Sequence, residues 1–326
     1  MKLSVLDQSP IRQGGTPAQA VAETLELARA ADRLGYSRYW LAEHHSSEGL
    51  AGTVPEILIA RIAAETRNIR VGSGGVMLSH YAPLKVAETF RMLETLYPGR
   101  IDLGIGRAPG SDQRTASALQ HGPGALGIEH FPAQIAELIA FLADALPANH
   151  PFSGVHAMPT GNSVPEFSLL GSSDHSAAYA AYFGCAFSFA HFINDEGGTA
   201  VMEAYRRHFR ASAGLAAPHG SIGVLVLCAE TEVAAQALVS SRDLWRLRLD
   251  QGILAPIPPV EEALAYRYSE QELARVAYNR RRQVVGTPDQ VEARLLDLAA
   301  AYDVEEVVVV SICYDFAEAF ALPQQR

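Results

Sequence analysis

The fold class is decided by residues 38–73, RYWLAEHHSSEGLAGTVPEILIARIAAETRNIRVGS. Its first residues, Arg38–Ala42, form a short run of bulky apolar side chains that is typical of a buried strand. Helical spacing of apolar residues follows over Val54–Thr66, and Ile69–Ser73 returns to the strand pattern. A strand, a helix and a strand in this order predict a parallel βαβ unit.

The same alternation continues along the chain. Eight strands are predicted, at Leu3–Leu6, Arg38–Ala42, Ile69–Ser73, Ile101–Gly106, Glu166–Leu170, Cys185–Ala190, Ile222–Leu227 and Val307–Ile312. Helices are predicted at Pro17–Leu34, Val54–Thr66, Pro83–Leu96, Pro132–Leu146, His175–Phe183, Gly198–Ala211, Thr231–Leu249 and Pro288–Tyr302, with a short apolar segment at Phe316–Leu322. An open doubly wound sheet uses the same alternation, but eight strands in one chain favour a closed (β/α)8 TIM barrel, a single domain over residues 1–326.

Three stretches show neither pattern: Gln120–Phe131, Pro147–Pro165 and Asp250–Gly286. The last is too long for an ordinary connection, so we expect a long insertion before the eighth strand. Residues 250–286 are therefore a candidate lid. Its Arg280–Arg282 run is a candidate contact for a phosphate or an incoming flavin, and the alternative is a solvated surface excursion.

Composition excludes several classes of protein. Hydrophobic residues make up 48% of the 326 residues and charged residues 19%, which excludes a disordered chain, collagen and a coiled coil. The net charge of −10 makes nucleic acid and anionic membranes poor partners. Three isolated cysteines, Cys185, Cys228 and Cys313, indicate core thiols in a reducing compartment. Without a signal peptide or an apolar span, we expect a soluble cytoplasmic protein.

Polar residues follow most of the predicted strands. The carboxyl ends of barrel strands carry the chemistry of such folds, so we expect the site to be built there. The residues in question are Asp7, Gln8, Ser9, Glu43, His44, His45, Gly74, Gly75, Met77, His80, Arg107, Asp112, Arg114, Gly171, Ser172, Ser173, His191, Asn194, Asp195, Glu230, Tyr314 and Asp315.

A phosphate site is one interpretation of Leu170–Ser173, which precede a predicted helix containing Ser176. A strand ends, a glycine turns the chain, and a helix N-terminus presents free N–H groups beside small hydroxyls. Arg107 could add a charge-assisted hydrogen bond. The alternative is helix capping by Ser172 or Ser173 without a ligand.

Two further motifs admit two interpretations each. The glycines of Gly72–Gly75 allow a flat ring or a backbone to approach closely, or they form a turn without a ligand. Glu43–His45 lacks the spacing of a metal site, and His44 and His45 point to opposite sides if they continue a strand. One imidazole at the barrel mouth as a general base is favoured over a metal pair, and a structural histidine is the alternative.

Gly104–Gly110 resembles a dinucleotide-binding fingerprint in its glycine spacing. Pro109 and Asp112 argue against a helix directly after it, and an acidic strand end about 20 residues further on is missing. We therefore set this interpretation aside. The sequence also has no Walker lysine motif and no GxSxG elbow.

Five motifs together resemble the bacterial luciferase-like flavin monooxygenase family, and the resemblance covers nearly the whole chain. They are Tyr39–His45 (YWLAEHH), Val71–Leu78 (VGSGGVML), Tyr97–Arg107 (YPGRIDLGIGR), Leu170–Ser173 (LGSS) and Val285–Pro288 (VGTP). The resemblance implies a (β/α)8 barrel that uses reduced FMN, delivered by a flavin reductase, together with O2. A flavin C4a-peroxy intermediate would then oxidise a small organic substrate.

The resemblance also implies roles for individual residues. His44 matches the catalytic histidine, and Gly74 and Gly75 match a non-proline cis peptide under the flavin ring. Arg107, Ser172, Ser173 and Ser176 match the phosphate-binding positions, and Gly171 and Met77 complete the predicted cofactor site, which holds no metal. A cytoplasmic homodimer is implied as well.

The sequence departs from luciferase itself at two positions. Gly106 stands where the luciferase α subunit has a reactive cysteine, and Ser172 stands where it has an acidic residue, so light emission is not expected. The alternatives are a non-catalytic flavin-binding protein, a deazaflavin-dependent oxidoreductase, and a barrel for phosphorylated metabolites. The substrate is not readable, although Met77, Tyr81, Phe192 and Tyr314 are candidate apolar contacts.

Overall fold

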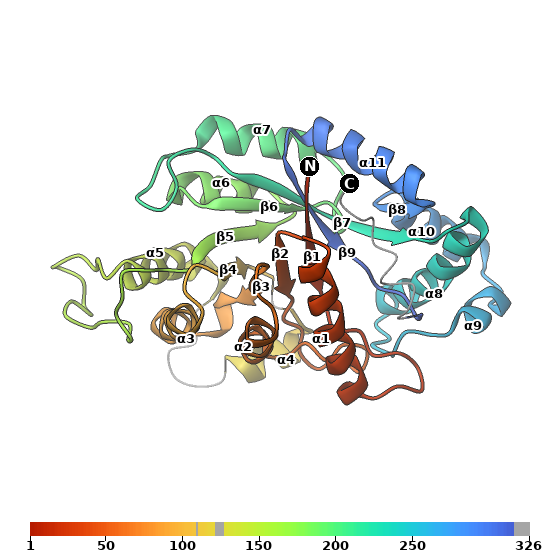
Figure 1. Ribbon diagram of the computed structural model, residues 1–326, viewed down its shortest axis with the longest axis horizontal. Coiled ribbons are helices and arrows are strands. Elements are labelled where there is room, and N and C mark those ends of the chain that lie inside the picture. The colour runs from red at the N-terminus through yellow and green to blue at the C-terminus, as the bar shows by residue number, and fades with distance from the viewer. Residues whose placement is uncertain (109, 121–126, 316–326) are drawn as a thin grey trace.

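A closed barrel of eight parallel strands forms the centre of the computed structural model, which describes residues 1–108, 110–120 and 127–315 (Figure 1). The barrel strands are β1 (Lys2–Asp7), β2 (Arg38–Leu41), β3 (Arg70–Met77), β4 (Ile101–Gly106), β5 (Glu166–Gly171), β6 (Ala186–Ala190), β7 (Gly220–Cys228) and β9 (Glu306–Val310). Strands β1 to β7 pair in chain order, and β9 closes the barrel by pairing with both β7 and β1. The predicted barrel and its eight strands are confirmed.

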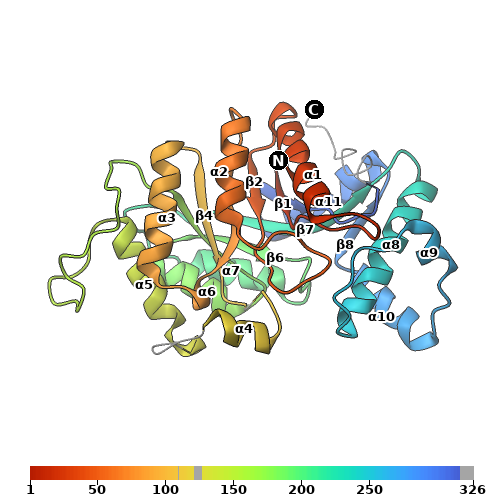
Figure 2. The ribbon, with the colours of Figure 1, turned by 90° about the horizontal axis from the view of Figure 1, so that it is seen from below.

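Eight helices follow the predicted pattern and surround the barrel (Figure 2). They are α1 (Pro17–Arg33), α2 (Pro55–Glu65), α3 (Pro83–Leu96), α5 (Phe131–Leu142), α6 (Asp174–Phe183), α7 (Gly198–His208), α8 (Glu232–Asp250) and α11 (Pro288–Tyr302). Thr16 and Thr287 cap α1 and α11 as capping boxes, and a proline follows each of them at the first position of the helix. None of the helices in the described ranges is long and apolar enough to cross a membrane.

The insertion before the last strand is real, but the prediction that it lacks regular structure is wrong. It contains α9 (Val260–Ala265), α10 (Glu270–Arg280) and the short strand β8 (Gln283–Gly286). Strand β8 pairs with the end of β7, from Leu225 to Cys228, and β9 pairs with β7 from Ser221 to Leu225. The strand pattern missed β8 because four residues are too few to show alternation.

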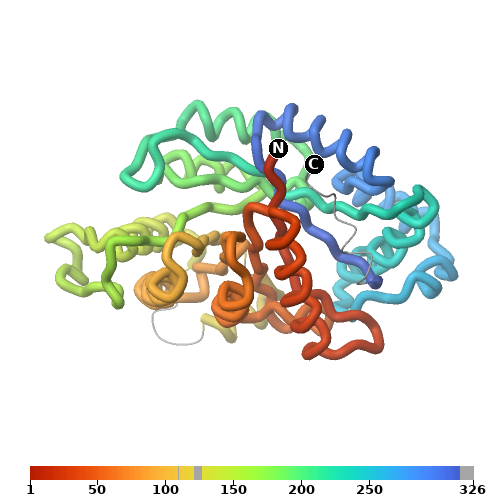
Figure 3. The backbone as a smooth tube through the Cα atoms, in the orientation of Figure 1, coloured from red at the N-terminus to blue at the C-terminus, as the bar shows by residue number. Residues whose placement is uncertain are grey.

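A second difference is the helix α4 (Gln113–Leu119), where the sequence argued against a helix. Asp112 does not oppose this helix but begins it, because its carboxylate accepts a hydrogen bond of 3.0 Å from the N–H of Thr115. Single turns of 3-10 helix occur at Leu78–His80 and Ile128–His130. The excursion over 147–165 has no helix or strand and projects from the body beyond α5 (Figure 3). The predicted segment Phe316–Leu322 lies outside the described residues.

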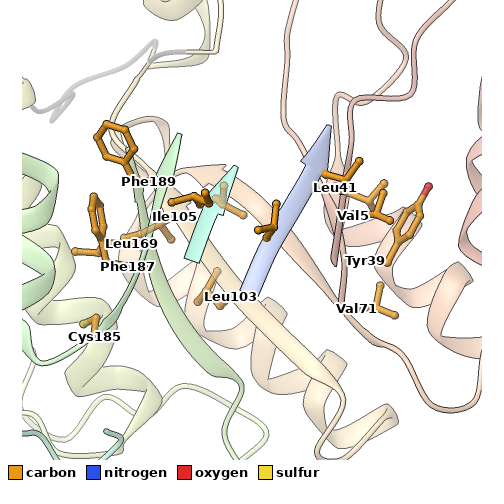
Figure 4. Packing of buried hydrophobic residues seen from close by; sticks show 14 of the residues in the cluster. Val5, Tyr39, Leu41, Val71, Leu103, Ile105, Leu169, Cys185, Phe187 and Phe189 are labelled. Carbon is orange, nitrogen blue, oxygen red and sulfur yellow. The ribbon is translucent and has the colours of Figure 1, made fainter. Parts of the chain in front are cut away.

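Alternation along the strands separates two environments. Outward side chains such as Val5, Tyr39 and Leu103 pack against the helices in one large apolar cluster (Figure 4). Inward side chains at the amino end are charged, and Arg38 pairs with Asp102 at 2.8 Å and with Glu306 at 3.1 Å. These ion pairs fill the bottom of the barrel, so an interior cavity can open only toward the carboxyl end.

Candidate active site

A cavity of about 240 Å³ lies at the carboxyl end of the barrel. Each barrel strand contributes an inward-facing residue to its wall: Leu6, Trp40, Gly74, Gly106, Leu170, Ala190, Gly223 and Val308. The cavity is therefore built by the whole barrel. Its wall also includes all eight residues of the predicted cofactor site: Gly74, Gly75, Met77, Arg107, Gly171, Ser172, Ser173 and Ser176. The structure brings these residues together, and their cofactor role remains a prediction.

The wall at Gly74 and Gly75 of β3 is bare backbone. Gly74 and Gly75 are joined by a cis peptide bond, as the family resemblance implies. A Cβ atom on Gly74 would lie 2.6 Å from Leu6 Cδ1, and one on Gly75 would lie 2.6 Å from the carbonyl oxygen of Gly104. These distances leave no room for a side chain, so the wall presents a flat peptide surface to a ligand.

Another part of the cavity wall combines a helix N-terminus with a cation. Strand β5 ends at Gly171, and the Ser173 hydroxyl caps α6 by accepting a hydrogen bond from the N–H of Ser176 at 3.4 Å. Arg107 is half-buried and lines the same cavity. Within the described part of the chain its guanidinium has no hydrogen bond or ion pair. Ser173 therefore caps the helix, while Arg107 remains available to an anion.

Glu43 organises the rim of the cavity beside β3. Its carboxylate is buried and accepts hydrogen bonds from His45 Nε2 at 2.7 Å, the Tyr81 hydroxyl at 2.7 Å and the N–H of Met77 at 3.0 Å. His45 is thus held by Glu43, and the expectation that one of the two imidazoles faces the barrel mouth as a general base stays a prediction. Tyr81 serves this network, so its predicted role as a substrate contact is not supported.

His44 has a different environment. Its backbone N–H donates to the carbonyl oxygen of Gly52 at 2.8 Å, and its Nδ1 is buried without a hydrogen-bond partner among the described residues. Burial lowers the pKa of His44 to about 4, and the adjacent His45 adds to the effect. The imidazole is thus neutral at pH 7, as a general base must be. His44 is not among the described residues that line the cavity. A proton passed between a bound ligand and His44 would therefore need a group that bridges the two.

Other predicted residues lie elsewhere. Met77 and Phe192 line the cavity, whereas the hydroxyl of Tyr314 donates to the carbonyl oxygen of Gln13 at 3.4 Å. The candidate anion-binding run is already engaged: Arg280 pairs with Asp243 at 2.5 Å, and Arg281 pairs with Glu196 at 3.1 Å.

Sequence reasoning missed the inward residues that precede the strand ends. Trp40 lines the cavity, and its indole N–H donates to Asp102 at 2.9 Å, which connects the cavity to the charged bottom of the barrel. Ser188 also lines the cavity and accepts a hydrogen bond of 2.9 Å from Ser221. Strand alternation carried this signal, because both residues are on the face opposite the outward core.

Comparison with known proteins identifies the family. Residues 1–304 match the family described as luciferase-like monooxygenase. The chain belongs to this family. It is 39% identical to a luciferase-like monooxygenase of Escherichia coli, over 96% of this chain and 92% of that protein. It is 37% identical to the N-acetyl-S-alkylcysteine monooxygenase of Bacillus subtilis, over 95% of this chain and 92% of that one.

Solved structures agree with this assignment. The crystal structure of apo-MsnO8 is 41% identical and superposes with a TM-score of 0.90. The match covers 98% of the present chain and 95% of MsnO8. Two more distant structures share the fold alone. One is the oxygenating constituent of 3,6-diketocamphane monooxygenase from Pseudomonas putida in complex with FMN, with 20% identity, a TM-score of 0.69, and coverage of 99% and 97% of the two chains. The other is an F420-dependent secondary alcohol dehydrogenase, with 11% identity, a TM-score of 0.71, and coverage of 98% and 96%.

Proposed function

We propose that this protein is an FMN-dependent monooxygenase that takes reduced FMN from a separate flavin reductase and oxidises a small organic molecule with O2. The observation that carries the proposal is the single cavity wall shared by Gly74–Gly75, Arg107 and the start of α6. A flat peptide surface and an available cation beside a helix N-terminus in the same wall fit a planar ring that carries a phosphate. Reduced FMN would supply the electrons that activate O2.

Different residues of the site would have different roles. Gly74 and Gly75 would support the flavin ring, and Gly171, Ser172, Ser173 and Ser176 would surround the phosphate with Arg107. His44, neutral at pH 7, would accept a proton during turnover, while Glu43 holds the cavity rim in place. Met77 would contact the ring from the β3 edge. The apolar part of the wall, formed by residues such as Leu6 and Val308, would exclude water from the reacting atoms.

The substrate class, location and assembly belong to the same proposal. The relative that acts on N-acetyl-S-alkylcysteine makes such thioethers the first substrates to test. Buried thiols at Cys185, Cys228 and Cys313 suit the reducing cytoplasm. Helices α2 and α3 expose Ile57, Met92 and Leu96, which supports a homodimer through this face.

Titration with FMN tests the cofactor directly. We expect reduced FMN to bind wild-type protein, and Arg107→Gln to weaken binding about tenfold or more, because a charge-assisted contact of about 1.5–3 kcal/mol is lost. Arg114→Gln is the control, since this exposed arginine follows the same strand but is not part of the cavity wall. Unchanged affinity in Arg107→Gln would remove Arg107 from the phosphate site.

Two alternatives give different results in the same assays. A deazaflavin-dependent oxidoreductase would bind a deazaflavin in preference to FMN, as the F420-dependent structural neighbour suggests. A non-catalytic flavin-binding protein would bind FMN without coupling oxygen consumption to a product. Oxygen uptake measured with a reductase, reduced FMN and an N-acetyl-S-alkylcysteine therefore separates the proposed monooxygenase from these two alternatives.

A further inference from the structure

One arginine of α8 is buried without a counterion in contact. Arg242 is 6% exposed, and its Nε and Nη1 are inaccessible to solvent and have no hydrogen-bond partner in the described part of the chain. The two carboxylates whose charges act on Arg242 both pair with other arginines, whereas Oδ1 of Asp243 has no partner among the described residues. Asp243 pairs with Arg280 at 2.5 Å, and Asp250 pairs with Arg246 at 2.7 Å.

Positive charge is in excess around Arg242. Arg246 and Arg282 each also have a buried Nε without a partner among the described residues. Burial lowers the pKa of Arg242 to about 9, and the charge of Arg246 adds to the effect. Arg242 is still a cation at pH 7, and a buried cation with unsatisfied donors is strongly unfavourable unless an anion or water completes it.

Arg242 is connected to the cavity through Trp245, although neither residue is among the described residues that line it. Its guanidinium is 5.7 Å from the ring centroid of Trp245, which packs in one apolar cluster with cavity residues including Trp40 and Phe192. The next cavity residue, Ile193, is fixed by Arg282, whose Nη1 donates to its carbonyl oxygen. Arg242 and Arg282 therefore lie behind the part of the wall that follows β6, whereas Arg107 lines the wall after β4.

We propose that Arg242 is a specificity residue that binds an acidic group, a carboxylate, of the organic substrate. The inference rests on the proposed function and narrows it to substrates that carry a carboxylate. A guanidinium binds a carboxylate through two parallel N–H donors, and Nε with one Nη is the pair that Arg242 leaves unsatisfied. The flavin phosphate would stay at Arg107, so two anions would bind at different arginines.

The chain offers a fluorescent probe for this site. Its two tryptophans are Trp40 and Trp245, so Trp40→Phe leaves Trp245 as the single reporter beside Arg242. The ligands are butanoate and butanamide, which match in size and differ in charge, titrated at constant ionic strength. We expect butanoate to bind this protein at least tenfold tighter than butanamide, and Arg242→Gln to abolish the preference. Arg207→Gln is the control, since this exposed arginine pairs with Glu203 on the same helix and with no other described residue.

Stability of the ligand-free protein gives a second readout. An arginine without a partner should be replaceable, so Arg242→Gln and Arg242→Met should have a Tm equal to or above that of the wild type, and butanoate should raise the Tm of the wild type alone. A lower Tm in both variants would show a structural role and overturn the proposal. Equal binding of butanoate and butanamide, or binding of neither, would overturn it as well. Either result would mean that water, and not an anion, completes the donors of Arg242.

Titration of FMN in the presence of butanoate separates this inference from the proposed function. We expect the Kd for FMN to change by less than twofold, because the two anions bind at different arginines. Competition between them would mean that Arg242 serves the flavin phosphate. Loss of butanoate selectivity with intact FMN binding contradicts the inference alone, whereas absent FMN binding contradicts the proposed function.

Discussion

At the scale of the residue, Glu43 separates the roles of two adjacent histidines. The sequence indicates that one histidine faces the site but cannot say how the other is satisfied. In the structure His45 is bonded to Glu43, which also holds Tyr81 and the backbone of Met77. These contacts join residues up to 38 positions apart, so they depend on the register of β2 against β3. Motif spacing does not contain that register.

Replacement of His44 tests its role as the base. His44→Gln should leave FMN affinity within about twofold and lower kcat by about 10²–10⁴, the usual range for loss of a general base. Since the pKa of His44 is about 4, the wild-type rate should fall only as the pH drops toward 4, where the imidazole gains a proton. The measurement is kcat/KM against pH. His45→Gln is the control, because it replaces the neighbouring histidine of the same motif. Turnover of His44→Gln at the wild-type level would exclude the acid/base role.

At the scale of the element, the clearest failure of sequence reasoning is the insertion before β9. Its helices are short: α9 has 6 residues and α10 has 11, and Pro256, Pro258 and Pro259 obscure the pattern in front of them. The insertion is also attached at both ends. Ile257 exchanges backbone hydrogen bonds with Ile11 and Gln13, and β8 pairs with β7. A moving lid is therefore restricted to α9 and α10.

Limited trypsin digestion tests that lid. Arg267 is exposed in the loop between α9 and α10, and polar contacts such as the ion pairs Arg248–Glu262 and Arg275–Asp250 join these helices to α8. If α9 and α10 close over the cavity, reduced FMN should slow cleavage after Arg267 severalfold, as judged by mass spectrometry. Cleavage after the exposed Arg210, which follows α7, should not change. Equal rates at Arg267 with and without reduced FMN would contradict the lid.

At the scale of the whole molecule, strand alternation carries more information than the motifs. It predicts the barrel and the outward core, because each outward side chain must pack against a helix. It does not predict which inward side chains pair across the barrel, since Arg38 meets partners 64, 128 and 268 positions away. The fold class and the number of barrel strands were therefore predictable from the sequence. The residues that line the cavity could be identified only from the closed barrel.

The proposed homodimer is a property of the assembled surface. Ile57 on α2 is 68% exposed, and Leu96 on the adjacent α3 is 57% exposed, so together with Met92 they leave apolar area in water. Ile57→Asp should convert a dimer of wild-type protein into a monomer, since an unpaired charge in a buried interface is strongly unfavourable. Light scattering after size-exclusion chromatography measures the mass. Val233→Asp, at an 82% exposed position on α8, should leave the dimer intact, and a wild-type monomer would refute the proposal.

The charged bottom of the barrel should set the acid limit of stability. Burial opposes ionisation of Glu306, but hydrogen bonds from His219 and Ser4 and the charge of Arg38 hold its pKa at about 2, below the ordinary 4.5. A carboxyl whose pKa is lower in the folded chain stabilises the fold above pH 4.5 and loses this contribution as the pH falls through 2.

The shift from 4.5 to about 2 corresponds to a contribution on the order of 3 kcal/mol to the free energy of unfolding. Between pH 5 and pH 2 the wild type should therefore lose about that much more stability than Glu306→Gln, measured by urea denaturation at each pH. Glu305→Gln is the matched control, because this neighbour is exposed and should follow the wild-type curve. Parallel curves for the wild type and Glu306→Gln would mean that the remaining pairs of Arg38, with Asp102 and Glu166, hold the barrel bottom without Glu306.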